Sequence, residues 1–249
     1  MTRGLGPRLY GVLAATIGSV GIGLLAFFLT DQRGSIRVDG PATKALTVAA
    51  LIDAGLVLLF GLQHSLMARP SVKRWVARVL PESGVRSTYV MMSGLMLILL
   101  VCVWQPIPVV LYRIDAPLAI GMMWLFFIAG LLLAGAATVA IDFWDLMGLR
   151  QSGVLPERDD VFTIGWLHRR VRHPIYTGLI LIFWCTPTMS YGRLLLAIAM
   201  TLYIRIGIHF EERDLQRRFG DTYTVYRTQV PMLIPTLSPY TAPKTNGPD

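Results

Sequence analysis

The chain has 249 residues, of which 54% are hydrophobic and only 15% are charged, and its mean hydropathy is +0.55. This composition excludes an ordinary water-soluble domain and predicts an integral membrane protein. The formal net charge of +8 does not indicate a nucleic-acid partner, because basic residues collect in the cytoplasmic loops of membrane proteins. The two cysteines, Cys102 and Cys185, lie in apolar segments and are interpreted as buried apolar residues, not as a disulfide or a metal pair.

Apolar segments occur six times along the chain, and a membrane-spanning helix needs about 20 mostly apolar residues. They cover residues 9–29, 45–67, 88–110, 118–141, 175–190 and 193–209. The first is longer than the apolar part of a signal peptide, so we interpret it as a transmembrane helix. The last two are short and meet at a turn near Pro187, which predicts a helical hairpin that crosses the bilayer partly or fully. We therefore expect an all-α integral membrane protein with five or six transmembrane helices, six being favoured.

A single domain, 1–249, accounts for the whole chain. Within it we expect four transmembrane helices (1–141), a cytoplasmic loop (142–174), the hairpin (175–209), a helical cytoplasmic tail (210–238) and a disordered end (239–249). Seventeen Lys and Arg residues fall on the side of the termini and the 68–87 and 142–174 loops, against five on the other side. The positive-inside rule therefore predicts that both termini are cytoplasmic.

Two polar clusters bracket the hairpin, so they meet at one side of the membrane. The first contains Arg172, His173 and Tyr176, and the second contains Glu211 and Glu212. Pro174 fits the first turn of a helix, whose free N–H groups favour an anion, and adjacent carboxylates favour a cation or hydroxyl groups. A zwitterionic ligand suits this combination. The alternatives are that His173 anchors the hairpin at the interface and that a Glu pairs with Arg205, Arg213 or Arg172. Gly178 allows a backbone or a flat ligand to approach.

Polar residues inside the earlier apolar segments also need a reason, because they are costly there. Asp53 is interpreted as the partner of a hydroxyl group on a neighbouring helix. His64 lies near the cytoplasmic end of the second segment, and it is equally a functional residue or a helix–helix hydrogen-bond partner. Arg86-Ser87-Thr88-Tyr89 is predicted to cap the third helix, while Asp142 and Asp145 close the fourth. The topology places all of these near one cytoplasmic-side pocket. The four histidines are scattered without metal-ligand spacing, so we expect no metal.

Several motifs resemble a known family. The C-terminal set is Arg172-His173-Pro174-x-Tyr176-x-Gly178, Glu211-Glu212-x-x-Leu215, Gly220-x-x-Tyr223-x-x-Tyr226 and Val230-Pro231 with Pro235. It is similar to the isoprenylcysteine carboxyl methyltransferase-like integral membrane methyltransferases. Further motifs are Gln63-His64-Ser65-x-Met67-Ala68-Arg69-Pro70, Arg86-Ser87-Thr88-Tyr89, Ile141-Asp142-x-x-Asp145 and Trp184-x-Thr186-Pro187. These resemble the NnrU-type branch, whose members include enzymes that methylate methanethiol.

The resemblance implies an S-adenosylmethionine-dependent thiol S-methyltransferase that converts methanethiol to dimethyl sulfide in a bacterial inner membrane. It implies that the cofactor is held by Arg172, His173, Tyr176, Gly178, Glu211, Glu212, Met232, Leu233 and Pro235. A thiol must lose its proton before it attacks. His64 is the first candidate for the base, with Arg86, Tyr89, Asp142 and Asp145 as its candidate partners.

Three alternatives remain at this point. The acceptor could be another thiol, a lipid amine or a prenylated cysteine. A non-enzymatic NnrU-type membrane protein linked to denitrification is the second alternative, although the presence of His173, Tyr176, Glu211 and Glu212 together favours an enzyme. A transporter is the third and is disfavoured, since no inverted repeat is evident.

Overall fold

The computed structural model describes residues 4–31, 37–156 and 165–240. Its helices are α1 (Leu5–Thr30), α2 (Leu46–Ala68), α3 (Pro70–Val76), α4 (Glu82–Val103), α5 (Pro117–Ile141), α6 (Phe143–Leu146), α7 (Pro174–Trp184) and α8 (Tyr191–Gln229). Two short strands, β1 (Val110–Arg113) and β2 (Thr188–Ser190), pair antiparallel. The all-α membrane fold is thereby confirmed.

Five of the helices in the described ranges, α1, α2, α4, α5 and α8, are long and apolar enough to cross a membrane. The sixth apolar segment forms α7, which has only 11 residues. A helix of that length extends about 16 Å, whereas the hydrocarbon core is about 30 Å thick. The structure thus has five long helices and a short one, within the range that the sequence predicts.

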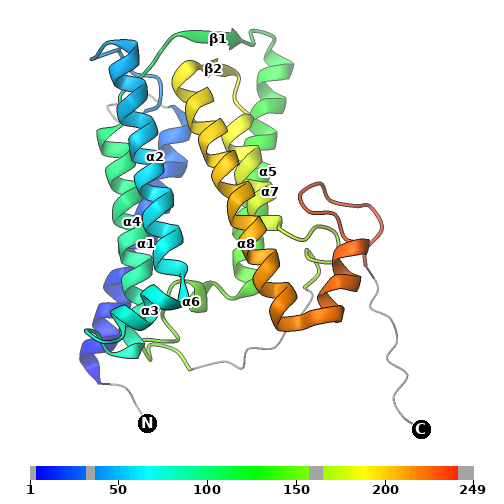
Figure 1. Ribbon diagram of the computed structural model, residues 1–249. Helices are drawn as coiled ribbons and strands as arrows, with labels where there is room; N and C mark the ends of the chain where they lie inside the picture. The colour runs from blue at the N-terminus through cyan, green and yellow to red at the C-terminus, as the bar shows by residue number, and fades with distance from the viewer. Residues whose placement is uncertain (1–3, 32–36, 157–164, 241–249) are drawn as a thin grey trace.

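The long helices form a bundle with the connections at its two ends (Figure 1). Helix α1 packs on α4, α4 on α2, and α2 on α8, while α7 packs between α5 and α8. The strand pair β1–β2 closes one end, and α3, α6 and the kinked end of α8 lie at the other (Figure 1). The α7–α8 hairpin therefore has one end at the strand pair, and its open end, where Arg172, His173 and Glu212 lie, is directed toward the other end of the bundle.

Close helix contacts depend on glycine at two interfaces. A Cβ on Gly21 of α1 would lie 2.6 Å from the carbonyl oxygen of Gly94 on α4, and a Cβ on Gly178 of α7 would lie 2.5 Å from that of Gly130 on α5. Small residues allow backbones to approach in this way inside membranes. Gly178 therefore faces α5 through its backbone, which is the first of the two roles the sequence left open for it.

The main apolar core contains residues from helices at the start, middle and end of the chain. It contains Phe28 of α1, Leu100 of α4, and Leu196 and Ile208 of α8, each about 1% exposed. Side chains of α1, α4 and α8 therefore pack in one cluster, which holds one face of α8.

Several expectations about element boundaries are corrected by the structure. The predicted 88–110 helix is α4, which begins at Glu82 and ends at Val103, so Arg86 to Tyr89 lie inside the helix and do not cap it. The predicted 175–190 segment leaves the helix after Trp184, and its last three residues form β2. The helix predicted for the tail after residue 209 is present as the continuation of α8, which ends at Gln229 and has a kink at Gly220 whose φ of 51° suits glycine. The strand pair is not predicted by the sequence.

The partner of Asp53 also differs from the expectation. Its carboxylate is fully buried and accepts a hydrogen bond of 2.8 Å from the backbone N–H of Gln105, not from a hydroxyl group. Gln105 follows the end of α4, so Asp53 holds the connection between α4 and β1.

Part of the sequence analysis concerns residues outside the described ranges. These include four of the basic residues counted for orientation, Arg3, Arg33, Arg158 and Lys244, and residues 241–249 of the segment predicted to be disordered. Tyr240 does lie within the described part, where its backbone N–H donates to the carbonyl of Arg169 over 2.7 Å.

Candidate functional site

The start of α7 is held against the C-terminal tail by backbone hydrogen bonds. The N–H groups of Arg172 and His173 donate to the carbonyls of Pro231 and Met232, over 2.9 and 3.2 Å. His173 is the residue before the helix, and Pro174 occupies the first helical position, where no N–H is needed. The local sequence therefore ends the loop, starts the helix and presents His173 toward α8.

Glu212 is the buried centre of the first polar cluster. Its Oε1 lies 2.8 Å from Arg172 Nε and 3.1 Å from His173 Nε2, and the three side chains are each no more than 8% exposed. Arg227 Nε lies 3.7 Å from the other carboxylate oxygen. The Arg172 guanidinium also donates to the backbone carbonyls of Arg227 and Val230. Arg172 and Glu212 thus satisfy each other and hold the tail, which resolves the open pairing in favour of Arg172.

Glu211, the neighbouring residue, is placed differently. Its side chain is 45% exposed, accepts a hydrogen bond of 3.0 Å from the Tyr176 hydroxyl, and lies 3.8 Å from His173 Nδ1. A carboxylate has about four acceptor positions, so Glu211 retains capacity for further donors. The structure brings together Arg172, His173, Tyr176, Glu211 and Glu212, as the sequence predicts.

The tail residues of the predicted cofactor set differ in their exposure. Met232 and Leu233 are half-buried against the main core, and the Leu233 carbonyl accepts from the Thr177 hydroxyl over 2.8 Å. Arg205 contacts the Met232 sulfur, with Nη1 2.6 Å away. Pro235 is exposed. The segment 231–233 therefore lies along the start of α7, next to the cluster of acidic residues.

A second polar cluster forms around His64. Its ring nitrogens lie within hydrogen-bond distance of two α4 side chains, with Nε2 2.5 Å from the Tyr89 hydroxyl and Nδ1 3.0 Å from Ser93 Oγ. The Arg86 guanidinium lies 5.0 Å from the centre of the Tyr89 ring. Tyr203 of α8 completes the surroundings, with its ring centre 6.3 Å from that of His64. His64 is therefore held between α4 and α8.

Tyrosines of both clusters pack against the main apolar core. Tyr176, which is bonded to Glu211, and Tyr203, whose ring lies beside His64, are both half-buried against it. Tyr203 and Ser93 were missed by the sequence analysis. A signal existed for Ser93, since it lies four residues after Tyr89 and therefore on the same helix face.

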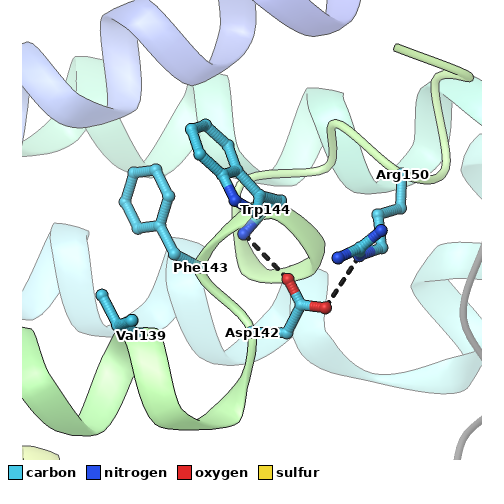
Figure 2. Close-up of a pocket in the computed structure, with 5 residues that line it drawn as sticks. All are labelled: Val139, Asp142, Phe143, Trp144 and Arg150. Atoms are coloured by element: carbon cyan, nitrogen blue, oxygen red, sulfur yellow. Dashed lines mark hydrogen bonds and ion pairs between the residues drawn. The ribbon is translucent and has the colours of Figure 1, made fainter. Parts of the chain in front are cut away.

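The last two candidates, Asp142 and Asp145, belong to the α6 turn. The Asp142 carboxylate accepts from the N–H groups of Trp144 and Asp145 and pairs with Arg150 over 2.7 Å (Figure 2). Burial acts to raise the Asp142 pKa, but the Arg150 hydrogen bond and the backbone donors outweigh it, so the pKa is lowered. Asp145 accepts from the Gln151 amide over 2.8 Å. The Arg86 Nε donates to the Leu146 carbonyl, which joins this turn to α4.

A cavity of about 270 Å³ adjoins the α6 turn and is lined by Val139, Asp142, Phe143, Trp144 and Arg150 (Figure 2). Asp142 faces Arg150 there, and the geometry gives both side chains a structural role in shaping the turn. Within the described ranges, no group of three or more His, Cys, Asp or Glu residues has the arrangement of a metal site.

The fold and these two clusters define an integral membrane protein with a polar site at the mouth of its C-terminal hairpin. The family model described as "NnrU protein" matches residues 51–229, and the chain belongs to this family. Methanethiol S-methyltransferase 2 of Bradyrhizobium diazoefficiens is 46% identical, over 82% of this chain and 79% of its own length. Methanethiol S-methyltransferase of Mycobacterium tuberculosis is 36% identical, over 91% and 95%.

A relative with a different name also matches. Nurim of Sus scrofa is 33% identical over 70% of each chain, and its name states no reaction. No solved structure gives a significant match.

Proposed function

We propose that the chain transfers a methyl group from S-adenosylmethionine to methanethiol and so forms dimethyl sulfide within a membrane-embedded pocket. Relatives with the name methanethiol S-methyltransferase, similar along most of the chain, support the choice of reaction. The structural observation that supports it is the half-exposed Glu211 carboxylate, held by Tyr176 beside the paired Arg172–His173–Glu212 group.

The residues at the hairpin mouth fit this cofactor. S-adenosylmethionine carries an amino group and ribose hydroxyls, and the exposed acceptor positions of Glu211 suit either of them. The half-buried Met232 and Leu233 provide apolar surface for the adenine ring. Arg172 and Glu212 act here by holding the tail against α7, because their polar atoms are already paired. His173 connects the two glutamates and positions Tyr176, whose ring centre lies 5.6 Å from its own.

The reaction requires the protein to align the thiol with the cofactor and to exclude water. The cofactor supplies an electrophilic methyl group on a sulfonium sulfur. The thiolate forms one carbon–sulfur bond as the bond to the sulfonium breaks, so an in-line arrangement is the main requirement. The rings of Tyr89 and Tyr203 pack against His64 and limit its contact with bulk water.

His64 is proposed to take the thiol proton. A neutral imidazole has one nitrogen with a free lone pair and one N–H group, and both of its nitrogens have a hydroxyl neighbour. The Ser93 hydroxyl can accept the Nδ1–H and so fix the tautomer in which Nε2 accepts from the Tyr89 hydroxyl. The thiol proton would then pass to Nε2 through Tyr89, which gives its own proton to His64 as it takes that of the thiol.

The proposed orientation places the hairpin mouth, α3 and α6 on the cytoplasmic side, with both termini cytoplasmic and the chain in a bacterial inner membrane. The excess of Lys and Arg at this end of the bundle supports the orientation. S-adenosylmethionine, made in the cytoplasm, would then reach the site without crossing the membrane.

Purified protein in detergent, incubated with S-adenosylmethionine and methanethiol, is expected to release dimethyl sulfide into the headspace. His64→Gln should lower kcat by about 10²–10⁴, the usual contribution of a general base, and leave the Kd for the cofactor unchanged. His209→Gln is the matched control, because His209 is exposed on α8 and its ring lies beside that of Phe210, away from the proposed site residues.

Each other outcome selects a different function. Cofactor binding without product would redirect the search to another thiol, a lipid amine or a prenylated cysteine. Absence of cofactor binding would overturn the enzyme proposal and support a non-catalytic role. Equal losses in the His64 and His209 variants would remove His64 as the base and leave the reaction in place.

A further inference from the structure

A second cavity, of about 440 Å³, lies far from the hairpin mouth. One wall comes from the α1–α2 connection, within residues 37–43, and the other from the end of α4 and the residues that follow it, within 101–106. The pair formed by Asp39 and Arg193 joins this connection to the start of α8, beside β2. The lining residues therefore lie where apolar helices meet polar connections, which in a membrane is the level of the lipid head groups.

Arg37 supplies the charge of this cavity. Its side chain is half-buried, and no ion pair or hydrogen bond within the described ranges engages its guanidinium group. A Cβ on Gly40 would lie 3.6 Å from Arg37 Nε and 3.1 Å from the ring of Pro106, so the guanidinium group lies against Gly40 near the opposite wall. A partly buried cation without a counter-ion is a binding group for an anion.

The other polar groups of the lining are donors or are already paired. The Thr43 hydroxyl donates to Gln105 Oε1 over 3.1 Å, and the Gln105 amide donates to the Val103 carbonyl. Trp104 is 6% exposed, and its indole N–H has no acceptor within the described part of the chain. None of the described lining residues is acidic. A ligand that suits this cavity therefore carries negative charge and accepts hydrogen bonds.

The apolar part of the lining favours an anion that is attached to a lipid. Pro41, Val101 and Pro106 face the cavity. Leu46 at the start of α2 is 51% exposed, and Val103 at the end of α4 is 39% exposed, so apolar surface continues from the cavity along both helices. The volume lies within the range of about 300–1,000 Å³ that is typical of ligand sites, and it suits a head group but not a whole lipid.

We propose that this cavity binds the head group of an anionic phospholipid, with the Arg37 guanidinium group on the phosphate and the acyl chains beside α2 and α4. The planar guanidinium group presents parallel donors that match two phosphate oxygens, and such charge-assisted hydrogen bonds are stronger than neutral ones. The site lies at the end of the bundle opposite the proposed cofactor site, and the proposal does not depend on the methyl-transfer reaction.

Native mass spectrometry of delipidated protein, titrated with phosphatidylglycerol in a neutral detergent, tests the role of Arg37. Wild type should retain one lipid per chain, and Arg37→Gln should raise its Kd about tenfold, the scale of one charge-assisted interaction. Arg37→Lys keeps the charge without the planar group and should raise the Kd less. Arg113→Gln is the matched control, since Arg113 is an exposed cation on β1 at the same end. Equal Kd values for wild type and Arg37→Gln would overturn the proposal.

Cys102 provides a chemical probe of the cavity itself, because its thiol is exposed and it belongs to the lining. In a Cys185→Ala background, phosphatidylglycerol should slow the alkylation of Cys102 by N-ethylmaleimide in a saturable way, and Arg37→Gln should weaken this protection. Phosphatidylcholine and inorganic phosphate at the same concentration should protect little. Equal protection by inorganic phosphate would assign the cavity to a free anion, and equal protection by phosphatidylcholine would indicate coverage by any lipid. Either result, or alkylation that does not respond to phosphatidylglycerol, would overturn the proposal.

Discussion

The two ends of the α7–α8 hairpin each contain a buried arginine–carboxylate group, and they differ in how completely it is closed. At the end near β1–β2, Arg193 is 7% exposed and pairs with Asp39 over 2.6 Å. It also donates to the Leu29 carbonyl, and Ser190 donates to the second oxygen of Asp39. This group joins the α1–α2 connection to the start of α8, and its polar atoms find their partners within the protein.

At the hairpin mouth, the Arg172–Glu212 pair is also buried and hydrogen-bonded within the protein. The side chain of Glu211 beside it, however, is 45% exposed. A buried ion pair that is fully satisfied contributes to a single conformation, whereas removal of one partner leaves a costly buried charge. The difference indicates that one end of the hairpin is built for structure alone. The other end combines a structural pair with a carboxylate that remains available to a ligand.

The largest effect on stability is expected at the closed end. Arg193→Met would leave the largely buried Asp39 (13% exposed) without its cation and the Leu29 carbonyl without a donor, so the free energy of unfolding should fall by about 3–5 kcal/mol. Unfolding in mixed micelles measures this change. Protein that remains folded should bind S-adenosylmethionine with unchanged Kd. Arg113→Met, at the same end on exposed β1, should change stability by no more than about 0.5 kcal/mol. A large loss of cofactor affinity in Arg193→Met would contradict the assignment of this end to structure.

Glu212→Gln should produce an intermediate effect with two components. The amide keeps the shape but removes the charge that Arg172 and His173 share, so the free energy of unfolding should fall by about 2 kcal/mol. The cofactor Kd should rise as well, because the tail is then held less firmly against α7. Unfolding and calorimetric titration of the same preparation measure both quantities. Glu82→Gln, exposed in the first turn of α4, is the control. Unchanged stability with lost binding would place Glu212 among the ligand contacts and not in the structural pair.

Much of the fold follows from local sequence, since apolar runs determine which segments become membrane helices. The expected runs reappear as α1, α2, α5 and the hairpin. One error came from hydropathy considered alone. Residues 104–110 are apolar, but Pro106 and Pro108 cannot continue a helix, so the chain leaves α4 after Val103. Beyond that point the path depends on long-range contacts, because Asp53 binds the Gln105 N–H and β1 pairs with a strand about 78 residues later in the chain.

The candidate site, too, could be predicted from the sequence only in part. Arg172, His173, Tyr176, Glu211 and Glu212 could be grouped from sequence, because a hairpin brings its two flanks together. The partner of each glutamate could not, since Arg172, Arg205 and Arg213 all lie within reach in sequence terms. Tyr203 was equally hidden, because a tyrosine in an apolar run is ordinary until α2 and α8 are seen to meet at Gly61.

Glu211→Gln gives the smallest structural effect and the sharpest comparison between neighbours. Glu211 is half-exposed and is not the centre of the buried pair, so the free energy of unfolding should change by no more than about 0.5 kcal/mol. The amide has fewer acceptor positions and no charge for the amino group or hydroxyls of the ligand, so the cofactor Kd should rise about tenfold, or about 1.4 kcal/mol. Asp214→Asn, 69% exposed and paired with Arg217 on the same helix, should leave both quantities unchanged. A fall in stability as large as that of Glu212→Gln would mean that the two carboxylates form one structural unit, and the ligand would then have to bind elsewhere in the hairpin mouth.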